Sequence, residues 1–159
     1  MKIAVVDDSK FTRMVIKQIL NDSSNTDFCW EAENGKIALE KNTRDPVDLI
    51  ISDLEMPVLD GLQLLKTVIG GEAKTKCLLI SAFHKSNQPK IIDALKAGAI
   101  GFIEKNSLGK GFDINSLKKE IDKYINFLTQ DNILKEEIRA TSLENDLRKP
   151  VVKNRADFI

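Results

Sequence analysis

Short apolar runs alternate with amphipathic segments along most of the chain. Five of these runs have the length and apolar content of buried strands, and they cover residues 3–6, 28–32, 47–52, 77–81 and 100–104. After each run, apolar residues recur at helical spacing and predict a helix. Five strands that alternate with five helices predict an α/β fold, in which helices cover both faces of a doubly wound parallel sheet.

Capping residues and glycines indicate where several of these helices begin and end. Asp8 or Ser9 is expected to cap the first helix. The apolar positions of this helix are Phe11, Met14, Val15, Ile19 and Leu20. The third helix is expected over residues 61–69, Gly98 closes the fourth, and the fifth covers residues 114–128. In a doubly wound sheet the functional site lies at the carboxyl ends of the strands, where the strand order reverses.

Charge and composition exclude several classes of protein. The chain has 24 basic and 24 acidic residues and lacks the clustered basic excess of a nucleic-acid-binding surface. No apolar run approaches the length of a membrane helix, and the N-terminus does not read as a signal peptide. Cys29, Cys77 and the single His84 do not have the spacing of a metal site. We therefore expect a cytoplasmic protein with no direct nucleic-acid binding and no membrane association.

Polar residues that suit phosphoryl chemistry follow four of the five predicted strands. Asp7 and Asp8 follow the first, Asp53 the third, Ser81 ends the fourth and Lys105 follows the fifth. Three carboxylates at one sheet edge would repel each other, and a hard divalent cation such as Mg²⁺ would relieve the repulsion. Asp53 could then act as a nucleophile toward a metal-bound phosphoryl group, with Lys105 and Ser81 contacting its oxygens.

Taken one at a time, these residues have ordinary structural explanations. Asp7 or Asp8 alone is most often a helix cap, and Asp53 alone is most often a loop acid. Lys105 alone is most often a solvated lysine, and Ser81 alone a hydroxyl bonded to backbone. Their joint placement at one edge of the predicted sheet favours the functional interpretation.

This set of residues resembles the receiver domain of bacterial response regulators, the phosphorylated proteins of two-component signalling. The resemblance rests on Asp7-Asp8, on Asp53 within DLEMPVLDG, on Ser81-Ala82, on Phe102 and on Lys105, and it covers residues 1–128. It implies a (βα)5 flavodoxin-like receiver fold with the strand order 2-1-3-4-5. It also implies a histidine kinase as the partner that donates the phosphoryl group.

The resemblance implies a role for each acidic residue. Asp53 would be the phosphoacceptor. Asp8 and Asp53 would bind Mg²⁺ directly, the backbone carbonyl of Glu55 would be a third ligand, and Asp7 would act through water. The glutamate side chain at position 55 leaves the rate of autodephosphorylation open.

The resemblance also implies how phosphorylation would be transmitted. Ser81 and Lys105 would contact the phosphoryl group, and Phe102 would be an aromatic switch that turns inward when Ser81 moves toward the phosphoryl oxygens. Pro57 and Gly61 would shape the loop after the phosphoacceptor. The face made of the fourth helix, fifth strand and fifth helix would then control an output domain or a target protein.

Three residues depart from the family pattern. Glu55 replaces commoner residues, and Ser81 stands in place of threonine but should preserve the hydroxyl contact. Asn106 follows Lys105, whereas the family usually has a proline there and a cis peptide before it. A cis bond before a residue other than proline costs about 3–4 kcal/mol. We therefore expect this bond to be trans or strained.

The segment 129–159 is a helical extension or an interdomain linker. Ile133, Leu134, Ile138, Leu143 and Leu147 would lie on a continuation of the fifth helix or on a separate, self-associating helix. A homodimer through this tail or through the face around the fifth strand stays open. Pro150 and the apolar end of the chain suggest a cut near the start of another strand, before an output domain.

A narrower resemblance suggests which output domain this would be. The run ALKAGAIGFIEKNSLGKGFDINSLKKEI is similar to the receiver of chemotaxis protein-glutamate methylesterases, which join it to a Ser-His-Asp hydrolase domain. The chain has no GxSxG-like turn, so we expect no esterase activity from these residues, only self-phosphorylation and dephosphorylation.

Two other functions use the same fold or chemistry. An aspartate-nucleophile phosphatase normally has a second aspartate two residues after the nucleophile, where this chain has Glu55, and its nucleophile follows the first strand. A flavin-binding electron carrier would need a Ser/Thr-rich phosphate loop after the first strand, where Asp7 and Asp8 would repel the flavin phosphate.

Overall fold

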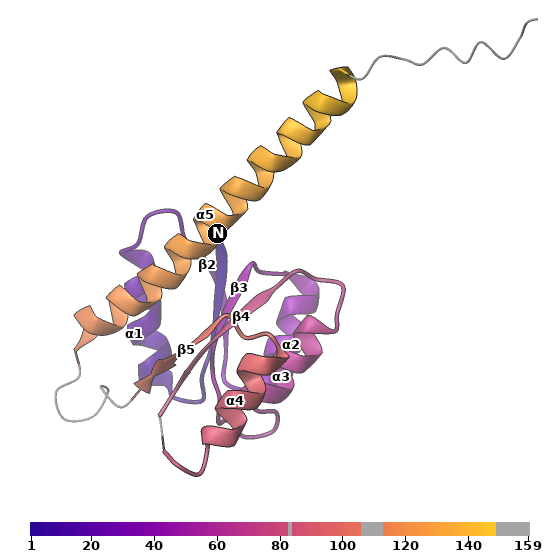
Figure 1. Ribbon diagram of the computed structural model, residues 1–159. Helices are drawn as coiled ribbons and strands as arrows, with labels where there is room; N and C mark the ends of the chain where they lie inside the picture. The colour runs from indigo at the N-terminus through magenta and orange to yellow at the C-terminus, as the bar shows by residue number, and fades with distance from the viewer. Residues whose placement is uncertain (83, 106–112, 149–159) are drawn as a thin grey trace, which may run out of the picture. The chain divides into compact units, whose positions relative to one another are not determined.

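The computed structural model describes residues 1–82, 84–105 and 113–148. Strands and helices alternate as predicted (Figure 1). The elements are β1 (Lys2–Val6), α1 (Lys10–Asn21), β2 (Asp27–Ala32), α2 (Gly35–Arg44), β3 (Leu49–Asp53), α3 (Gly61–Ile69), β4 (Lys76–Ser81), α4 (Gln88–Ala97), β5 (Gly101–Glu104) and α5 (Ile114–Arg148).

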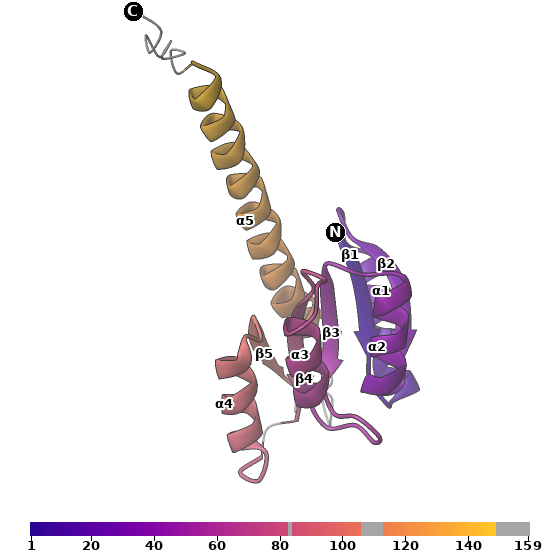
Figure 2. The ribbon, with the colours of Figure 1, turned by 90° about the vertical axis from the view of Figure 1, so that its right-hand side faces the viewer.

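The five strands form one parallel sheet in the order β2-β1-β3-β4-β5. This order confirms the one implied by the family resemblance. The order reverses between β1 and β3, which are hydrogen-bonded neighbours although β2 separates them in sequence. Helix α1 lies on one face of the sheet, and α2, α3 and α4 lie on the other (Figures 1 and 2).

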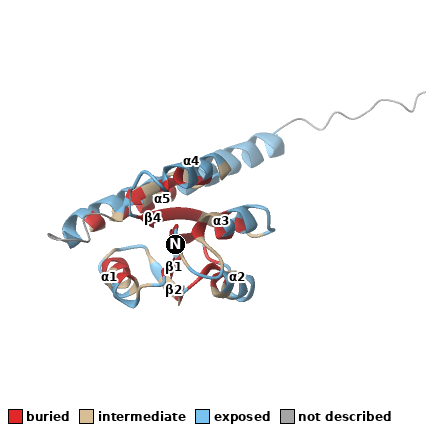
Figure 3. Ribbon diagram, turned by 90° about the horizontal axis from the view of Figure 1, so that it is seen from below, coloured by how far each residue is buried: buried red, intermediate tan, exposed pale blue. Residues whose placement is uncertain are grey.

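The central strands are buried because helices cover both faces of the sheet. Ile3 to Val6 in β1 are fully buried, and Leu49 to Ile51 in β3 are at most 1% exposed (Figure 3). This explains why these strands appear in the sequence as continuous apolar runs instead of alternating patterns. Strand β3 begins two residues later than predicted and ends on Asp53, so the predicted phosphoacceptor is part of the strand.

Helix α1 turns a different side to the sheet from the one its largest apolar residues suggest. Phe11 and Met14 are exposed, at 63% and 56%. The buried residues of this helix are Thr12, Ile16, Ile19 and Leu20. Thr12, Ile16 and Ile19 are spaced four and three residues apart, so they form one stripe, while Phe11 and Met14 lie on its flank.

Local capping fixes where the helices begin and end. Ser9, and not Asp8, caps α1, because its Oγ accepts a hydrogen bond from the Thr12 amide at 3.3 Å. Asp60 begins α3 in a reciprocal capping box with Gln63. Gly98 ends α4 as predicted, with a φ of 114° that residues with a Cβ rarely adopt.

The chain divides into two compact units, Met1–Asp122 and Lys123–Ile159. Helix α5 continues without interruption to Arg148, so the tail up to that residue extends the fifth helix and does not form a separate one. Pro150 and the apolar end of the chain lie outside the described residues. The domain boundary at 128 stays a prediction. Among the described residues, no helix is both long enough and apolar enough to span a bilayer.

Candidate functional site

The parallel register brings the ends of distant strands to one edge of the sheet. Val6 of β1 is paired with Ser52 of β3, and the next residues along the chain are Asp7 and Asp53, so these two residues lie side by side. Asp53 is in turn paired with Ile80, one residue before the end of β4. The Asp7 amide donates a hydrogen bond to Ala32 on β2 at 3.1 Å, which extends the pairing of β1 by one residue.

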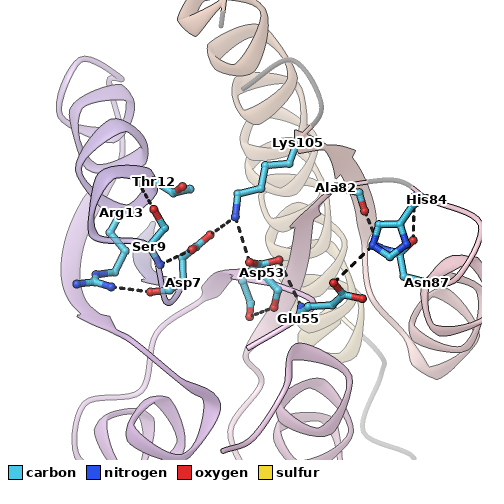
Figure 4. Close-up of polar contacts among 11 residues, drawn as sticks. Asp7, Ser9, Thr12, Arg13, Asp53, Glu55, Ala82, His84, Asn87 and Lys105 are labelled. Carbon is cyan, nitrogen blue, oxygen red and sulfur yellow. Dashed lines mark hydrogen bonds and ion pairs between the residues drawn. The ribbon is translucent and has the colours of Figure 1, made fainter. Parts of the chain in front are cut away.

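Lys105 joins two of the predicted acidic residues. Its Nζ atom lies 2.8 Å from Oδ2 of Asp7 and 3.0 Å from Oδ2 of Asp53 (Figure 4). The Lys105 side chain is 17% exposed, and those of Asp7 and Asp53 are 1% and 9% exposed. These ion pairs are therefore largely shielded from water, and their mutual attraction is stronger than at an open surface.

Asp8 completes a cluster of three carboxylates. One oxygen from each of Asp7, Asp8 and Asp53 can be chosen so that all three lie within 4.8 Å of one another. Asp8 is exposed, whereas Asp7 and Asp53 are buried, so the cluster has one ligand on the solvent side. With Lys105 as the ammonium group paired to the cluster, three negative charges meet one positive charge. Hard oxygen ligands with excess negative charge fit a divalent cation of the Mg²⁺ type.

Burial and charge shift the pKa values of two groups in the site. Burial raises the pKa of Asp7, and the nearby charge of Asp53 raises it further, against the lowering effect of Lys105 and of the Ser9 amide. Burial lowers the pKa of Lys105, but its hydrogen bonds to Asp7 and Asp53 and their charges outweigh burial, so the net shift is upward. Lys105 is therefore charged at neutral pH.

The backbone of Asp7 is held by a residue that sequence reasoning missed. The Arg13 side chain donates a hydrogen bond from Nη1 to the Asp7 carbonyl at 2.6 Å. Its Nε atom lies 3.5 Å from a Glu31 carboxylate oxygen without the geometry of a hydrogen bond. The Ser9 amide donates to Oδ1 of Asp7 at 2.8 Å. The sequence did contain a signal for this contact, because Arg13 lies one turn into the helix that follows the acidic pair.

The loop after Asp53 passes very close to the backbone of β3. The Gly61 amide donates to the Leu54 carbonyl at 2.8 Å, and a Cβ atom at position 61 would lie 2.2 Å from the Asp53 carbonyl oxygen. Only glycine fits this approach, which supports the predicted role of Gly61 in shaping the loop. The Leu59 amide donates to the Pro57 carbonyl at 2.9 Å, in a tight turn centred on the residue between them.

Glu55 contributes its backbone and its side chain in different directions. Its amide donates to Oδ1 of Asp53 at 3.4 Å, so its backbone lies beside the acidic cluster. Its carboxylate lies 3.6 Å from Nε2 of His84, on the loop after β4 (Figure 4). His84 is exposed, and the Ser86 hydroxyl contacts its Nδ1 atom.

Ser81 and Phe102 lie on neighbouring strands but in different surroundings. Ser81 is 2% exposed at the carboxyl end of β4, where it is paired with Glu104. Phe102 is half-buried on β5 and lines a surface pocket with Leu117 and Glu120 of α5. The peptide bond between Lys105 and Asn106 lies outside the described residues.

Comparison with known proteins gives the same family for most of the chain. The family model described as "Response regulator receiver domain" matches residues 3–122. A protein-glutamate methylesterase/protein-glutamine glutaminase from Syntrophomonas wolfei is 32% identical over 152 residues, which is 96% of this chain. A protein of the same description from Pyrococcus horikoshii is 38% identical over 120 residues, 76% of this chain.

A solved structure agrees with these sequence relatives. The response regulator domain of Thermotoga maritima CheB is 31% identical and superposes with a TM-score of 0.69, over 79% of this chain and 93% of that one. The chain spans 41% of the length of the Syntrophomonas relative and 32% of that of the Pyrococcus relative. The chain therefore belongs to the response regulator receiver domain family.

Proposed function

We propose that Asp53 accepts a phosphoryl group from the phosphohistidine of a histidine kinase. The observation that carries this proposal is the cluster in which Lys105 bridges Asp7 and Asp53 while Asp8 faces solvent. In the proposed reaction a carboxylate oxygen of Asp53 forms a bond to phosphorus as the bond from phosphorus to the histidine nitrogen breaks. Such a transfer needs positioning and charge stabilisation more than covalent chemistry from the protein.

We propose that the cluster holds Mg²⁺ in the manner implied by the family. Asp8 and Asp53 would be direct ligands with the Glu55 carbonyl, and Asp7 would act through water. The charges and the spacing of the three carboxylates and the single ammonium group support a divalent cation at this site. When bound, Mg²⁺ would polarise a phosphoryl oxygen and offset the charge that gathers there.

The remaining polar residues would hold the product and report its presence. Lys105, already at hydrogen-bond distance from Asp53, would pair with a phosphoryl oxygen, and Ser81 would donate a hydrogen bond to another. The phosphoryl group carries roughly −1.5 to −2 charges in place of the single charge of a carboxylate, and it brings three acceptor oxygens. This change biases an existing two-state equilibrium, and Phe102 would report it to the face of α4, β5 and α5.

We further propose that this receiver acts in chemotaxis. The named methylesterase relatives support this role, and the chain would control a methylesterase-type output domain or a target protein. In this proposal residues 1–128 are the receiver and residues 129–159 are the helical extension or linker. The residues present would undergo phosphorylation and dephosphorylation but would not catalyse ester hydrolysis.

Mass spectrometry after incubation with acetyl phosphate and Mg²⁺ tests the phosphoacceptor. The wild-type chain should gain a single phosphoryl adduct, and Asp53→Asn should gain none. Asp93→Asn is the matched control, because it makes the same change at an exposed position on α4 and should leave the adduct in place. An adduct that persists in Asp53→Asn at the wild-type level would contradict the assignment.

A further inference from the structure

Asn87 stands at the N-cap position of α4 but does not cap the helix. Its side chain makes no capping hydrogen bond to the amides of α4. Instead its Nδ2 atom donates to the Ala82 carbonyl at 2.6 Å, and its Oδ1 atom accepts from the His84 amide at 3.1 Å (Figure 4). The residue is 1% exposed. Asn87 therefore ties the loop after β4 to the start of α4 through both ends of its amide.

Asn87 binds Ala82, which directly follows Ser81, the residue proposed to contact the phosphoryl group. Ala82 is bonded to Ser81, the last residue of β4, and Ser81 is itself 2% exposed. A shift of Ser81 toward a phosphoryl group on Asp53 would carry the Ala82 peptide with it. The bond from Nδ2 of Asn87 to the Ala82 carbonyl would then have to lengthen or break.

A second contact crosses the same loop but is weaker. His84 and Glu55 approach to 3.6 Å, yet their side chains are 44% and 48% exposed. Exposed ion pairs contribute little, because water solvates the separated charges almost as well. The Asn87 side chain is nearly buried, so water replaces its lost partners less readily, and its contacts oppose loop movement more strongly.

We propose that Asn87 is a positioning residue that latches the loop between β4 and α4 in the resting conformation, and that phosphorylation works against this latch. The inference rests on the proposed function of Asp53 and adds a residue that regulates the same site. The latch lowers the fraction of molecules in the phosphoryl-binding conformation. The apparent affinity for a phosphoryl mimic is reduced by that same fraction.

Isothermal titration calorimetry tests the latch. The full chain is titrated with beryllofluoride in the presence of Mg²⁺, and the affinity is compared between variants. Asn87→Ala removes both contacts and should bind the mimic about tenfold more tightly than wild type, since a lost buried hydrogen bond shifts an equilibrium by about that factor. Asn87→Asp keeps an oxygen for the His84 amide and loses the donor to Ala82. It should also bind more tightly than wild type.

Asn42→Ala is the matched control for loss of a buried asparagine. The Asn42 amide also both donates and accepts, to Thr75 and from Val47, but these partners precede β4 and β3 at the opposite edge of the sheet. The control should bind beryllofluoride as wild type does. Unchanged or weaker binding by both Asn87 variants would overturn the latch.

Hydrogen exchange of the wild-type chain tests the latch without any substitution. The His84 amide donates to Asn87 in the resting conformation, so its exchange should accelerate when beryllofluoride and Mg²⁺ are added. Unchanged exchange at His84 on binding would also overturn the latch. A wild-type chain that binds no beryllofluoride at all would contradict the proposed phosphoacceptor site and not the latch specifically.

Discussion

At the scale of single residues, burial and charge oppose each other at Asp7. Its carboxylate is 1% exposed, and burial raises its pKa above the ordinary value of 3.8. Lys105 offsets part of this effect by its hydrogen bond. Functional sites often retain buried charged residues with shifted pKa values, although such residues lower the stability of the fold.

Replacing Asp7 by asparagine should stabilise the metal-free fold at neutral pH. A raised folded-state pKa means that the wild-type fold is favoured while Asp7 is protonated and loses stability as pH rises through that pKa. Asp7→Asn avoids this loss while Lys105 keeps its ion pair with Asp53, so we expect a gain of about 1 kcal/mol in the free energy of unfolding. Urea unfolding in EDTA measures it.

The pH dependence shows whether the stabilisation by Asp7→Asn comes from the ionisation of Asp7 or from a change that does not depend on charge. The advantage of Asp7→Asn should shrink as pH is lowered and disappear below 3.8, where the wild-type carboxyl is protonated in both the folded and the unfolded state. Glu33→Gln, at an exposed position between β2 and α2, should give no such advantage. A destabilised Asp7→Asn protein at neutral pH would argue that the charge of Asp7 supports the fold.

Val58 holds a backbone conformation that β-branched residues rarely adopt. Its φ is 71°, it lies at the centre of the tight turn between Pro57 and Leu59, and its side chain is 74% exposed. Asparagine tolerates positive φ better, and little buried surface is lost. Val58→Asn should therefore raise the free energy of unfolding by about 1 kcal/mol.

Thermal unfolding compares Val58→Asn with Val58→Thr. Threonine is similar in shape and also β-branched, so it retains the strain and should leave the midpoint near that of wild type. Equal midpoints for the asparagine and threonine variants would show that strain at position 58 does not limit stability.

At the scale of elements, neighbouring residues at the start of α1 have separate tasks. Ser9 caps the helix, Asp7 accepts the Ser9 amide, and Asp8 is left exposed beside the cluster. Because Ser9 performs the capping, the Asp8 carboxylate is not required for it. The same element also shows that apolar residues do not always face the core, since Phe11 and Met14 are exposed.

The start of α3 depends on a close contact between glycine and β3. Gly61→Ala would bring a Cβ atom to 2.2 Å from the Asp53 carbonyl oxygen, so the helix or the strand must move. We expect a loss of at least about 2 kcal/mol in the free energy of unfolding, as for other substitutions that overpack a rigid backbone. Chemical denaturation monitored by circular dichroism measures this loss.

Gly70→Ala is the control at the other end of the same helix. Gly70 has a φ of −75°, and a Cβ atom there would come no closer than 3.3 Å to its nearest neighbour. This contact is only slightly tight, so the variant should lose much less stability than Gly61→Ala. Equal losses at both positions would mean that the contact between Gly61 and Asp53 is not the cause.

At the scale of the whole molecule, the acidic cluster links cation binding to folding. Asp7 and Asp8 follow β1 and Asp53 ends β3, and the unfolded chain does not hold these segments together. Mg²⁺ that binds only the folded state should stabilise it by about 1.4 kcal/mol when its concentration is about ten times the dissociation constant. Thermal unfolding with increasing Mg²⁺ should therefore show a rising midpoint that EDTA reverses.

Asp53→Asn and a sodium control distinguish specific binding from screening. The midpoint of Asp53→Asn should respond little to Mg²⁺, because one direct ligand is lost. Sodium chloride at equal ionic strength reproduces screening of the clustered charges but not coordination. A midpoint that rises equally with Na⁺ and Mg²⁺ would count against a metal site.

Much of the fold and the location of the site could be predicted from the sequence. Buried strands appear as apolar runs, and helices appear as apolar residues at three- and four-residue spacing. Since parallel strands end at one edge, the sequence predicts that Asp7, Asp8, Asp53, Ser81 and Lys105 lie at that edge. The strand order came from family resemblance, because the pattern of apolar runs leaves several orders open.

Other features required the tertiary structure. Helical spacing alone did not determine which side of α1 is buried, because apolar residues lie on more than one side. The tail had no glycine and a single proline, Pro150, so the pattern could not distinguish a longer α5 from a separate helix.

The chemistry of the strand ends was determined by the sequence alone, because it depends on residue type and position along each strand. The partners of those residues were decided only by the tertiary structure, because they come from segments far apart in the chain. Lys105 bridges Asp7 and Asp53, which are 98 and 52 residues away along the chain. Arg13 and Asn87 bind carbonyls only six and five residues away, but the orientation of their side chains also depends on the packing around them. Each of these contacts depends on distances that folding sets and that spacing along the chain does not encode.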